Sequence, residues 1–326
     1  GAEVSAIAFY YALELHSRLG VPVGIVVSAI GGTNIDAWTP QEATAAYPSL
    51  KATTEYEVRE EKDFVATRDA TRVISSACQQ PGVLFNGMVA PFAPMAAKGA
   101  IWYQGCHNWE EPETYCDKMH ALYDGWSAAF ENPNLGFRFC QIAPYDRNWA
   151  ALQEAQSKFA AEEKNAAMAV LSDVGDPKDI HPNDKEIVAK RLALLALRHD
   201  YGFRDLVADS PTLRKWTGAD GRFVLDFDNV KSWYIHRPDR RNAVCGFEVA
   251  GADGIFHDAE VEGLGNWKNG HPSETITNAQ PVVGSREVPN PKHLRYLWKK
   301  PWRGFLFSEV DLPLGPFHIG EPLPKV

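Results

Sequence analysis

Residues 171–185, LSDVGDPKDIHPNDK, lie between a short apolar run at Ala167–Leu171 (AMAVL) and a helical pattern over Asp184–Tyr201. A buried run, a polar loop and a helix in this order are typical of an α/β fold, whose ligands bind at the carboxyl ends of the strands. In an extended chain, Asp179 and His181 point to the same side. The aspartate could then hold the imidazole by Nδ1–H and leave Nε2 to accept a proton from a hydroxyl. A solvated loop that happens to hold both residues is the alternative.

The chain before this loop repeats the alternation of strand and helix. Apolar runs rich in β-branched residues predict buried strands, and periodic apolar residues predict helices. The predicted strands are Val23–Ala29, Gly99–Tyr103 and Phe137–Ile142; the predicted helices are Ala2–Leu19, Pro112–Phe130 and Ala150–Glu163, with further solvent-facing helices within Gln41–Ser76. We therefore expect residues 1–207 to form a three-layer α/β/α domain around a parallel sheet.

The sequence changes character from about Asp209. Short strand-like runs separated by Gly, Pro, Asn and Asp are typical of a β-sandwich or jelly roll. These runs are Arg222–Phe227, Ala243–Ala250, Glu274–Thr277, Arg295–Trp298 and Gly304–Phe307. We expect a second, all-β domain over residues 208–326, with the boundary near Val207–Ser210.

Polar and glycine residues follow two of the predicted strands. Gly31 and Gly32 come after Val23–Ala29, where backbone N–H groups without a neighbouring Cβ can bind an anion or a developing oxyanion. Neither GxxxxGK[ST] nor GxGxxG is present, which argues against phosphate binding, and an ordinary tight turn is the alternative. Asn108 comes after Gly99–Tyr103 and can donate a side-chain N–H into the same crevice, although a capping or turn role competes.

Charge and cysteine usage narrow the classes of function. A net charge of −9 and a pI near 5.6 argue against nucleic acid or an anionic membrane as a partner. No apolar run approaches the length of a membrane span. The five cysteines have irregular spacing and no CxxC, which disfavours a structural zinc site or a disulfide framework. Cys106 and His107 are adjacent, a poor geometry for a catalytic pair.

Several stretches together resemble the SGNH-hydrolase carbohydrate esterases of the sialate O-acetylesterase type. In the first domain they are SAIAFYYALEL, VPVGIVVSAIGGTNIDAW, LFNGMVAPF, GAIWYQGCHN, FCQIAPY and DIHPNDKEIVAKRLAL, and in the second GFEVAG and NPKHLRYLWKKPWRGFLFSEVDLP. The resemblance covers nearly the whole chain. It implies the flavodoxin-like SGNH fold for the first domain.

The resemblance assigns roles residue by residue. Asp179 and His181 would be the acid and base of a Ser-His-Asp triad. Gly31 or Gly32 would give an oxyanion-hole N–H, and Asn108 a side-chain donor. Gln104, Trp38 and Tyr145 are candidate substrate contacts, although an aromatic ring can equally belong to the core. The chain departs from the family at Cys106-His107, where Glu-Ser is typical, and at Ile30, where Trp is usual.

The nucleophile that the resemblance implies is absent from the sequence. The family carries it in a Gly-Gln-Ser-Asn-Met block on the first strand, and no such block occurs here. We therefore expect a chain that lacks an N-terminal segment with the first strand, which in the order 2-1-3-4-5 lies between Val23–Ser28 and Gly99–Tyr103. Its absence should leave apolar surface and backbone groups exposed. Ser28 is the fallback nucleophile, but we favour a packing or hydrogen-bonding role for it.

The implied function is removal of O-acetyl groups from sialic acid or another acetylated glycan, without a metal or organic cofactor. The family suggests a secreted, periplasmic or lysosomal location. Without its nucleophile, this chain alone should be inactive. Three alternatives stay open: a non-catalytic glycan-binding protein, a subunit whose nucleophile comes from a separate peptide, and a metallohydrolase that uses His107, His181 and Asp179. The last is the weakest, because these residues have no recognisable ligand spacing.

Overall fold

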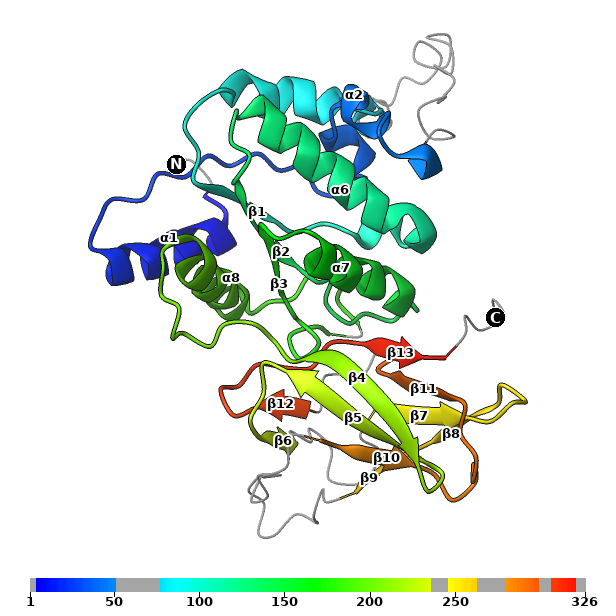
Figure 1. The fold of residues 1–326 in the computed structure, drawn as a ribbon. Helices are drawn as coiled ribbons and strands as arrows, with labels where there is room; N and C mark the ends of the chain where they lie inside the picture. The colour runs from blue at the N-terminus through cyan, green and yellow to red at the C-terminus, as the bar shows by residue number, and fades with distance from the viewer. Residues whose placement is uncertain are drawn as a thin grey trace.

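The computed structural model describes residues 4–50, 77–176, 178–235, 246–262, 280–298 and 306–320. Helices surround a parallel sheet in the first part, and antiparallel strands form the second (Figure 1). The α-helices are α1 (Ala6–Leu19), α2 (Gln41–Thr44), α6 (Pro112–Ala129), α7 (Ala150–Glu162) and α8 (Lys185–Asp200). Short 3₁₀ or π turns occur at Asp36–Trp38, Pro48–Leu50, Phe85–Val89, Ala90–Phe92 and Cys106–Asn108. None of the described helices is both long and apolar enough to span a membrane.

Three of the predicted strands form the parallel sheet. They are β1 (Gly99–Trp102), β2 (Gly136–Cys140) and β3 (Ala166–Ala169), in the order β1-β2-β3. Every residue of β2 is buried, as expected for the central strand of a sheet covered on both faces. The predicted ends of these strands are within two residues of the observed ones.

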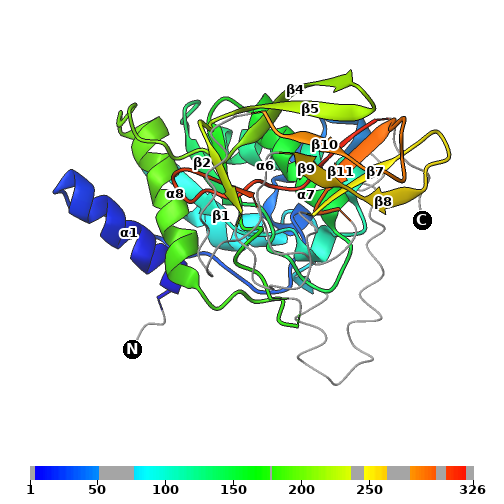
Figure 2. The same cartoon turned by 90° about the horizontal axis from the view of Figure 1, so that it is seen from below.

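Helices cover both faces of the sheet, so the predicted layer order is confirmed for these elements. The pair α1 and α8 packs together on one face, and α6 and α7 on the other (Figures 1 and 2). Local signals set the helix ends. Ser5 caps α1 and Gly20 ends it in the left-handed conformation at φ 68°. Asp184 caps α8 through the backbone N–H of Ile187.

One buried ion pair joins this helix layer to the sheet. Arg138 on β2 donates to both carboxylate oxygens of Asp200, the last residue of α8, at 3.0 and 2.5 Å. A Cβ at Gly136 would lie 2.6 Å from the Asp200 carboxylate, so the glycine makes room for this contact. The two-point arginine–carboxylate geometry fixes where α8 ends against the sheet.

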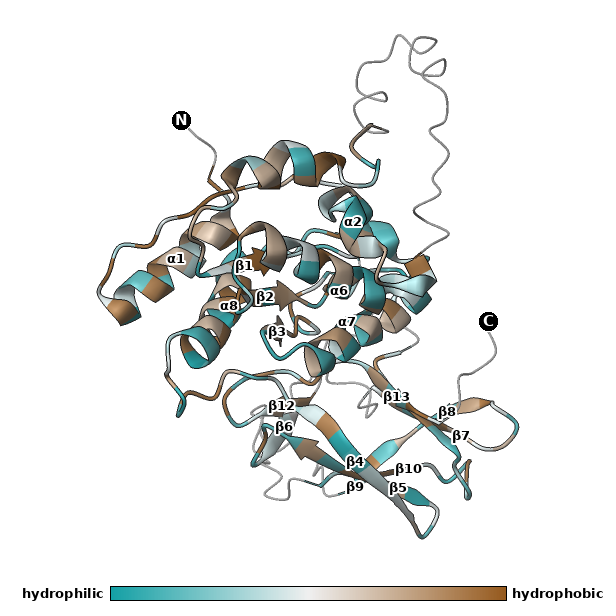
Figure 3. Ribbon diagram, turned by 45° about the horizontal axis from the view of Figure 1, so that its top comes forward, coloured by the Kyte–Doolittle hydropathy of each residue, from teal (hydrophilic) through white to brown (hydrophobic). Residues whose placement is uncertain are grey.

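The predicted strand at Val23–Ala29 is wrong for this structure. These residues form no strand, and their apolar side chains are exposed, Ile25 by 41% and Val26 by 48%. β1 is the edge of the sheet within the described residues. Figure 3 shows the hydrophobic colour along the segment after α1. The exposed apolar surface that we expected here is observed, and none of the described strands pairs with these residues.

The second part consists of short antiparallel strands. Its strands are β4 (Thr212–Ala219), β5 (Arg222–Asp228), β6 (Trp233–Ile235), β7 (Phe247–Ala250), β8 (Phe256–Asp258), β9 (Glu260–Glu262), β10 (Val282–Gly284), β11 (His293–Tyr296), β12 (Leu306–Ser308) and β13 (Phe317–Ile319). They form sheets in the orders β4-β5-β10-β9, β13-β11-β7-β8 and β12-β6. Side chains from all three sheets share one core, as in a sandwich. The change from helices to antiparallel strands falls between Asp200 and Thr212.

Some predictions fall outside the described residues. These are the strand at Glu274–Thr277, the beginnings of those at Ala243–Ala250 and Gly304–Phe307, and the helices over residues 51–76. Within Gln41–Leu50 the structure has α2 and the 3₁₀ turn Pro48–Leu50.

The two parts contact each other at the end of β3 and along α7. Ser172 donates to the backbone carbonyl of Leu314 at 3.0 Å, and Nδ1 of His318 on β13 lies 2.7 Å from Oε1 of Glu154 on α7. The β part therefore lies beside the loops that follow the parallel strands, where a ligand site is expected.

Candidate active site

The turn at Gly31-Gly32 is open to solvent. Gly32 has φ 73°, a conformation that favours glycine, and a Cβ at either position would meet nothing within 4 Å. Among the described residues, the backbone N–H groups of Gly31 and Gly32 form no hydrogen bond, whereas the carbonyl of Gly32 accepts one from Gln79 at 2.7 Å. Two unpaired amides on an open turn can receive an anionic oxygen.

Gln104 and Asn108 hold this turn against the end of β1. Nε2 of Gln104 donates to the carbonyl of Thr33 at 3.0 Å and to Oδ1 of Asn108 at 2.7 Å. The same Oδ1 accepts the backbone N–H of Ile35 at 3.0 Å. Oε1 of Gln104 accepts the hydroxyl of Tyr115 at 2.7 Å. The amide of Gln104 is thus engaged within the protein rather than free for a substrate.

Asn108 lies in the protein interior. It is only 2% exposed, and its Nδ2 donates to Oε2 of Glu111 at 2.8 Å and lies 3.5 Å from Oδ2 of Asp36. The expectation that Asn108 presents a free N–H to the crevice is not met in this conformation. A buried asparagine satisfies its donors and acceptors internally, because unpaired buried amides are costly.

Lys118 completes a buried charge network that sequence reasoning missed. Its Nζ lies 2.9 Å from Asp36 and 2.8 Å from Glu111. Burial alone would lower the pKa of Lys118, but the two carboxylates outweigh it and raise the pKa. Burial likewise opposes ionisation of Glu111, yet hydrogen bonds from Lys118 and Asn108 lower its pKa. No local sequence signal identifies these partners, since Asp36 lies 82 positions from Lys118 along the chain.

Asp179 and His181 lie on an exposed loop after β3. Oδ1 of Asp179 accepts the backbone N–H of His181 at 2.9 Å and lies 3.7 Å from Nδ1 of its ring. That separation is longer than a hydrogen bond. The His181 side chain is 84% exposed, so Nε2 is free to meet a substrate or another group. The two side chains are therefore adjacent, but the Asp179 carboxylate contacts the backbone N–H of His181 and does not hydrogen-bond its ring.

The residue between Asp179 and His181 packs against the core of the α/β part. Ile180 packs against the core cluster that contains Ile35 and Trp102, and Cys106 and Tyr145 pack against the same cluster. The loop and the residues after β1 and β2 thus surround one common core. Burial raises the pKa of Cys106 to about 11, which leaves its thiol neutral and a poor nucleophile.

The two aromatic residues predicted to contact the substrate, Trp38 and Tyr145, differ in their burial. Trp38 is 3% exposed, packs edge-on against Trp102 and donates Nε1–H to Thr33, so it is a core residue and not a surface for sugar. Tyr145 is half-buried and lies beside Trp149, with ring centroids 5.6 Å apart. Both line a pocket that Trp298 of the β part also borders. Asp179 and His181 do not line this pocket.

Ser28 has the hydrogen-bonding role that we favoured. Its hydroxyl donates to the backbone carbonyl of Met88 at 2.6 Å. This bond joins the extended segment after α1 to the π turn Phe85–Val89. A hydroxyl proton held by a carbonyl has no base to receive it, which argues against Ser28 as a nucleophile.

Comparison with known proteins identifies relatives among the sialate O-acetylesterases. Sialate O-acetylesterase from Rattus norvegicus is 28% identical over 288 residues, 76% of this chain and 51% of the rat protein. The Homo sapiens protein is 26% identical over 271 residues, 73% of this chain and 47% of its own length. This chain thus spans about half the length of the curated relatives that it matches.

A solved structure and a family model extend the similarity. The crystal structure of XAC1771, a carbohydrate acetylesterase from Xanthomonas citri, superposes with a TM-score of 0.79 at 30% identity, covering 98% of this chain and 66% of that one. The model of the family "Carbohydrate esterase, sialic acid-specific acetylesterase" matches residues 4–193, more than half of the sequence. This chain therefore belongs to the sialic acid-specific acetylesterase family of carbohydrate esterases.

Proposed function

We propose that this chain carries the base and the oxyanion donors of a serine acetylesterase that removes O-acetyl groups from sialosides or related acetylated glycans. The observation that carries the proposal is the Asp179–His181 pair, with a carboxylate 3.7 Å from Nδ1 and an exposed ring. In the reaction, Nε2 of His181 takes the proton of a serine hydroxyl as that oxygen attacks the acetyl carbonyl. Asp179 orients the imidazole and stabilises the imidazolium.

The tetrahedral oxyanion needs donors, and the free amides of Gly31 and Gly32 supply them. Hydrogen bonds to such an oxygen are stronger in the transition state than in the ground state, and one donor contributes about 10²–10³ in kcat. Asn108 would join them only by releasing Glu111. Otherwise it acts as a positioning residue, because it holds the N–H of Ile35 next to the turn.

We propose that the nucleophilic serine belongs to a strand outside this sequence, which pairs with the edge that β1 forms among the described strands. The exposed apolar side chains of Ile25 and Val26 and the edge position of β1 support such a neighbour. The Ser28 hydroxyl donates to the backbone carbonyl of Met88, which supports a nucleophile from outside this sequence. Tyr145, which is half-buried and lines the pocket that Trp298 borders, would stack on a sugar ring of the substrate.

The test compares this chain with the polypeptide translated from the complete reading frame that contains it. The substrates are 9-O-acetyl-N-acetylneuraminic acid and p-nitrophenyl acetate. We expect robust turnover by the complete polypeptide and little by the chain alone. In the complete polypeptide, His181→Ala should lower kcat/KM by about 10³-fold or more, with a smaller loss for Asp179→Asn.

A matched control is His107→Ala, because His107 is also exposed and follows a strand of the same sheet. It should change kcat/KM by less than about twofold. Turnover by the isolated chain that Ser28→Ala abolishes would overturn the assignment of the nucleophile. Full activity of His181→Ala in the complete polypeptide would overturn the mechanism.

A further inference from the structure

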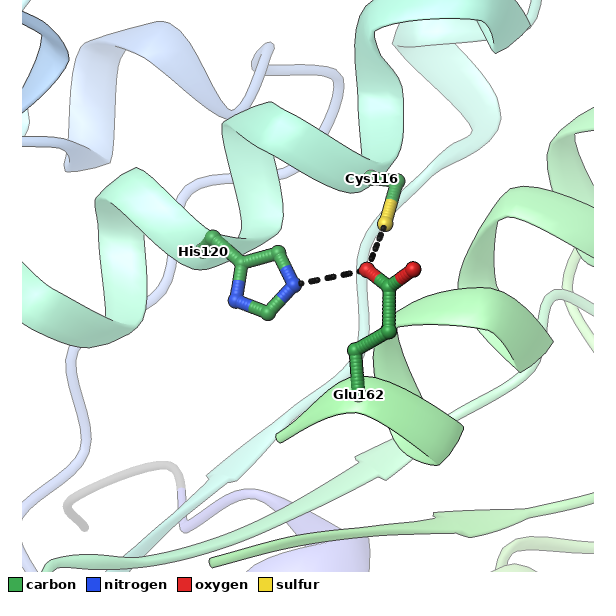
Figure 4. Close-up of side chains that lie close together, drawn as sticks. All are labelled: Cys116, His120 and Glu162. Atoms are coloured by element: carbon green, nitrogen blue, oxygen red, sulfur yellow. Dashed lines mark hydrogen bonds and ion pairs between the residues drawn. The ribbon is translucent and has the colours of Figure 1, made fainter. Parts of the chain in front are cut away.

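Three side chains with different metal-binding atoms meet between α6 and α7. Cys116 and His120 lie four residues apart on α6 and therefore on one face of that helix, and Glu162 ends α7 (Figure 4). Sγ of Cys116 is 3.5 Å and Nε2 of His120 is 3.2 Å from Oε2 of Glu162. All three donor atoms lie within 4.8 Å of one another. We propose that Cys116, His120 and Glu162 form a zinc site that joins the two helices.

The spacing suits tetrahedral zinc. Zinc bonds of about 2.0–2.3 Å at tetrahedral angles place neighbouring donor atoms about 3.3–3.6 Å apart. The two separations at Glu162, 3.5 and 3.2 Å, are close to these values. Two of the three distances between donor atoms therefore already suit zinc in the absence of the ion, and side-chain rotations would adjust the third.

The histidine ring is held in place from both sides. The ring of Phe159 packs edge-on against His120 with centroids 4.8 Å apart, and the ring of Tyr47 stacks at 6.3 Å and 15°. A ligand whose rotamer is fixed by packing loses little entropy when a metal binds. Lys158 contacts the other oxygen, Oε1 of Glu162, at 3.8 Å, so Oε2 remains directed at the cluster.

The donor set selects the kind of ion. Thiolate and imidazole favour zinc over magnesium or calcium, which prefer oxygen. A thiol binds zinc as the thiolate, so the entering ion displaces the Cys116 proton to solvent, while His120 keeps a proton on Nδ1 and binds through Nε2. The His120 and Glu162 side chains are 18% and 46% exposed, which gives the ion access and leaves the fourth position to water.

The experiment titrates the metal-free chain with ZnCl₂ by calorimetry and with CoCl₂ by absorbance. We expect one Zn²⁺ per chain with Kd below about 10 µM and a thiolate-to-cobalt charge-transfer band. Saturating zinc should raise Tm by about 5 °C, because it binds only the folded chain. Magnesium should do neither.

Variants at the three ligands identify the site. Cys116→Ser, His120→Gln and Glu162→Gln should each weaken zinc binding at least about tenfold, and Cys116→Ser should also abolish the charge-transfer band. The matched controls Cys106→Ser, His107→Gln and Glu163→Gln should bind zinc as the parent chain does. Circular dichroism checks that each variant folds, and a variant that does not fold is replaced by Cys116→Ala, His120→Asn or Glu162→Asp, for which the same loss is expected.

Two outcomes would overturn the proposal. One is the absence of zinc binding below about 10 µM to the folded parent chain. The other is zinc binding that the three ligand variants leave unchanged, which would place the ion elsewhere. The proposal does not depend on esterase activity, since every readout uses metal binding or stability.

Discussion

Oδ1 of Asn108 accepts the backbone N–H of Ile35 at 3.0 Å, a contact between residues 73 positions apart in the chain. It ties the segment after the Gly31-Gly32 turn to the segment after β1. The same oxygen also accepts a hydrogen bond from Gln104. A buried carbonyl with two donors fixes the distance between the two loops, so the turn keeps its place although its own amides are unpaired.

Removing this amide should destabilise the chain. We expect Asn108→Ala to lower the free energy of unfolding by about 2–3 kcal/mol, because it leaves the buried N–H of Ile35 without its acceptor and Nε2 of Gln104 with only the carbonyl of Thr33. Urea denaturation measures the change. Asn148→Ala, at an exposed position, should change it by less than about 0.5 kcal/mol. Equal small effects of both substitutions would contradict a structural role for Asn108.

The buried Lys118 should be more costly to lose than a surface lysine. Lys118→Met leaves the carboxylates of Asp36 and Glu111 close together without their shared cation. We expect a loss of about 2–3 kcal/mol in the free energy of unfolding, less than for a fully buried ion pair, because the Glu111 side chain is 45% exposed and water screens its charge. Lys190→Met, at an exposed position on α8, should cost less than about 0.5 kcal/mol.

A double-mutant cycle offers a second check on Lys118. Adding Glu111→Gln to Lys118→Met should recover part of the lost stability, because one of the two unpaired charges is removed. A double variant as unstable as the sum of the single ones would argue that the charges do not interact. Thermal or urea unfolding at neutral pH gives all four values of the cycle.

The contact between His318 and Glu154 should make the stability depend on pH. The hydrogen bond to Glu154 raises the pKa of His318 above its unfolded value, although burial partly opposes this. The stabilisation is therefore complete below about pH 6.5 and is lost as the pH rises through the raised folded pKa. Because both side chains are about one-third exposed, we expect a loss of only about 1 kcal/mol.

Urea denaturation between pH 5.5 and 8.5 tests this dependence. His318→Gln should flatten the profile over this range. His16→Gln should not, because the ring of His16 contacts the backbone carbonyl of Val21 and no carboxylate. An unchanged slope in His318→Gln would assign the pH dependence to another group.

The three strands of the parallel sheet could be predicted because each is a short run of mostly apolar residues. β1 and β3 consist of apolar residues, β2 is apolar except for Arg138, and each strand pairs with another of the three. The equally apolar run at Val23–Ala29 forms no strand. A strand also needs neighbouring strands along its edges, and the pattern of one run does not show whether they exist. An apolar run identifies residues that favour burial, but it does not show whether a neighbouring strand is present to bury them.

The candidate site shows the same division. The adjacency of Asp179 and His181 follows from their spacing and was found in the structure. The burial of Asn108 and Trp38 could not be foreseen, since it depends on contacts with residues far along the chain. The cluster on α6 and α7 carried one local signal, a cysteine and a histidine four residues apart, and its third member lies on another helix.

The exposed apolar side chains of the N-terminal region should make the chain self-associate. Phe9 and Val26 are 52% and 48% exposed, on α1 and on the segment that follows it. Exposed apolar side chains of this size promote association when they lie close together on the surface. We expect sedimentation velocity to show an association that grows with concentration, and Phe9→Ser with Val26→Thr to weaken it. The free energy of unfolding should change by less than about 0.5 kcal/mol, because the replaced side chains are already in contact with water.

The β part provides the matched control. Ile255 is 59% exposed, more than either residue of the N-terminal region, but it lies on the loop between β7 and β8. Ile255→Thr should leave the association unchanged if the N-terminal surface drives it. Equal weakening by Ile255→Thr would show that association follows from total exposed apolar area. The absence of association at all concentrations tested would contradict the prediction. It would indicate that the apolar side chains after α1 are less exposed to water in solution than in this structure.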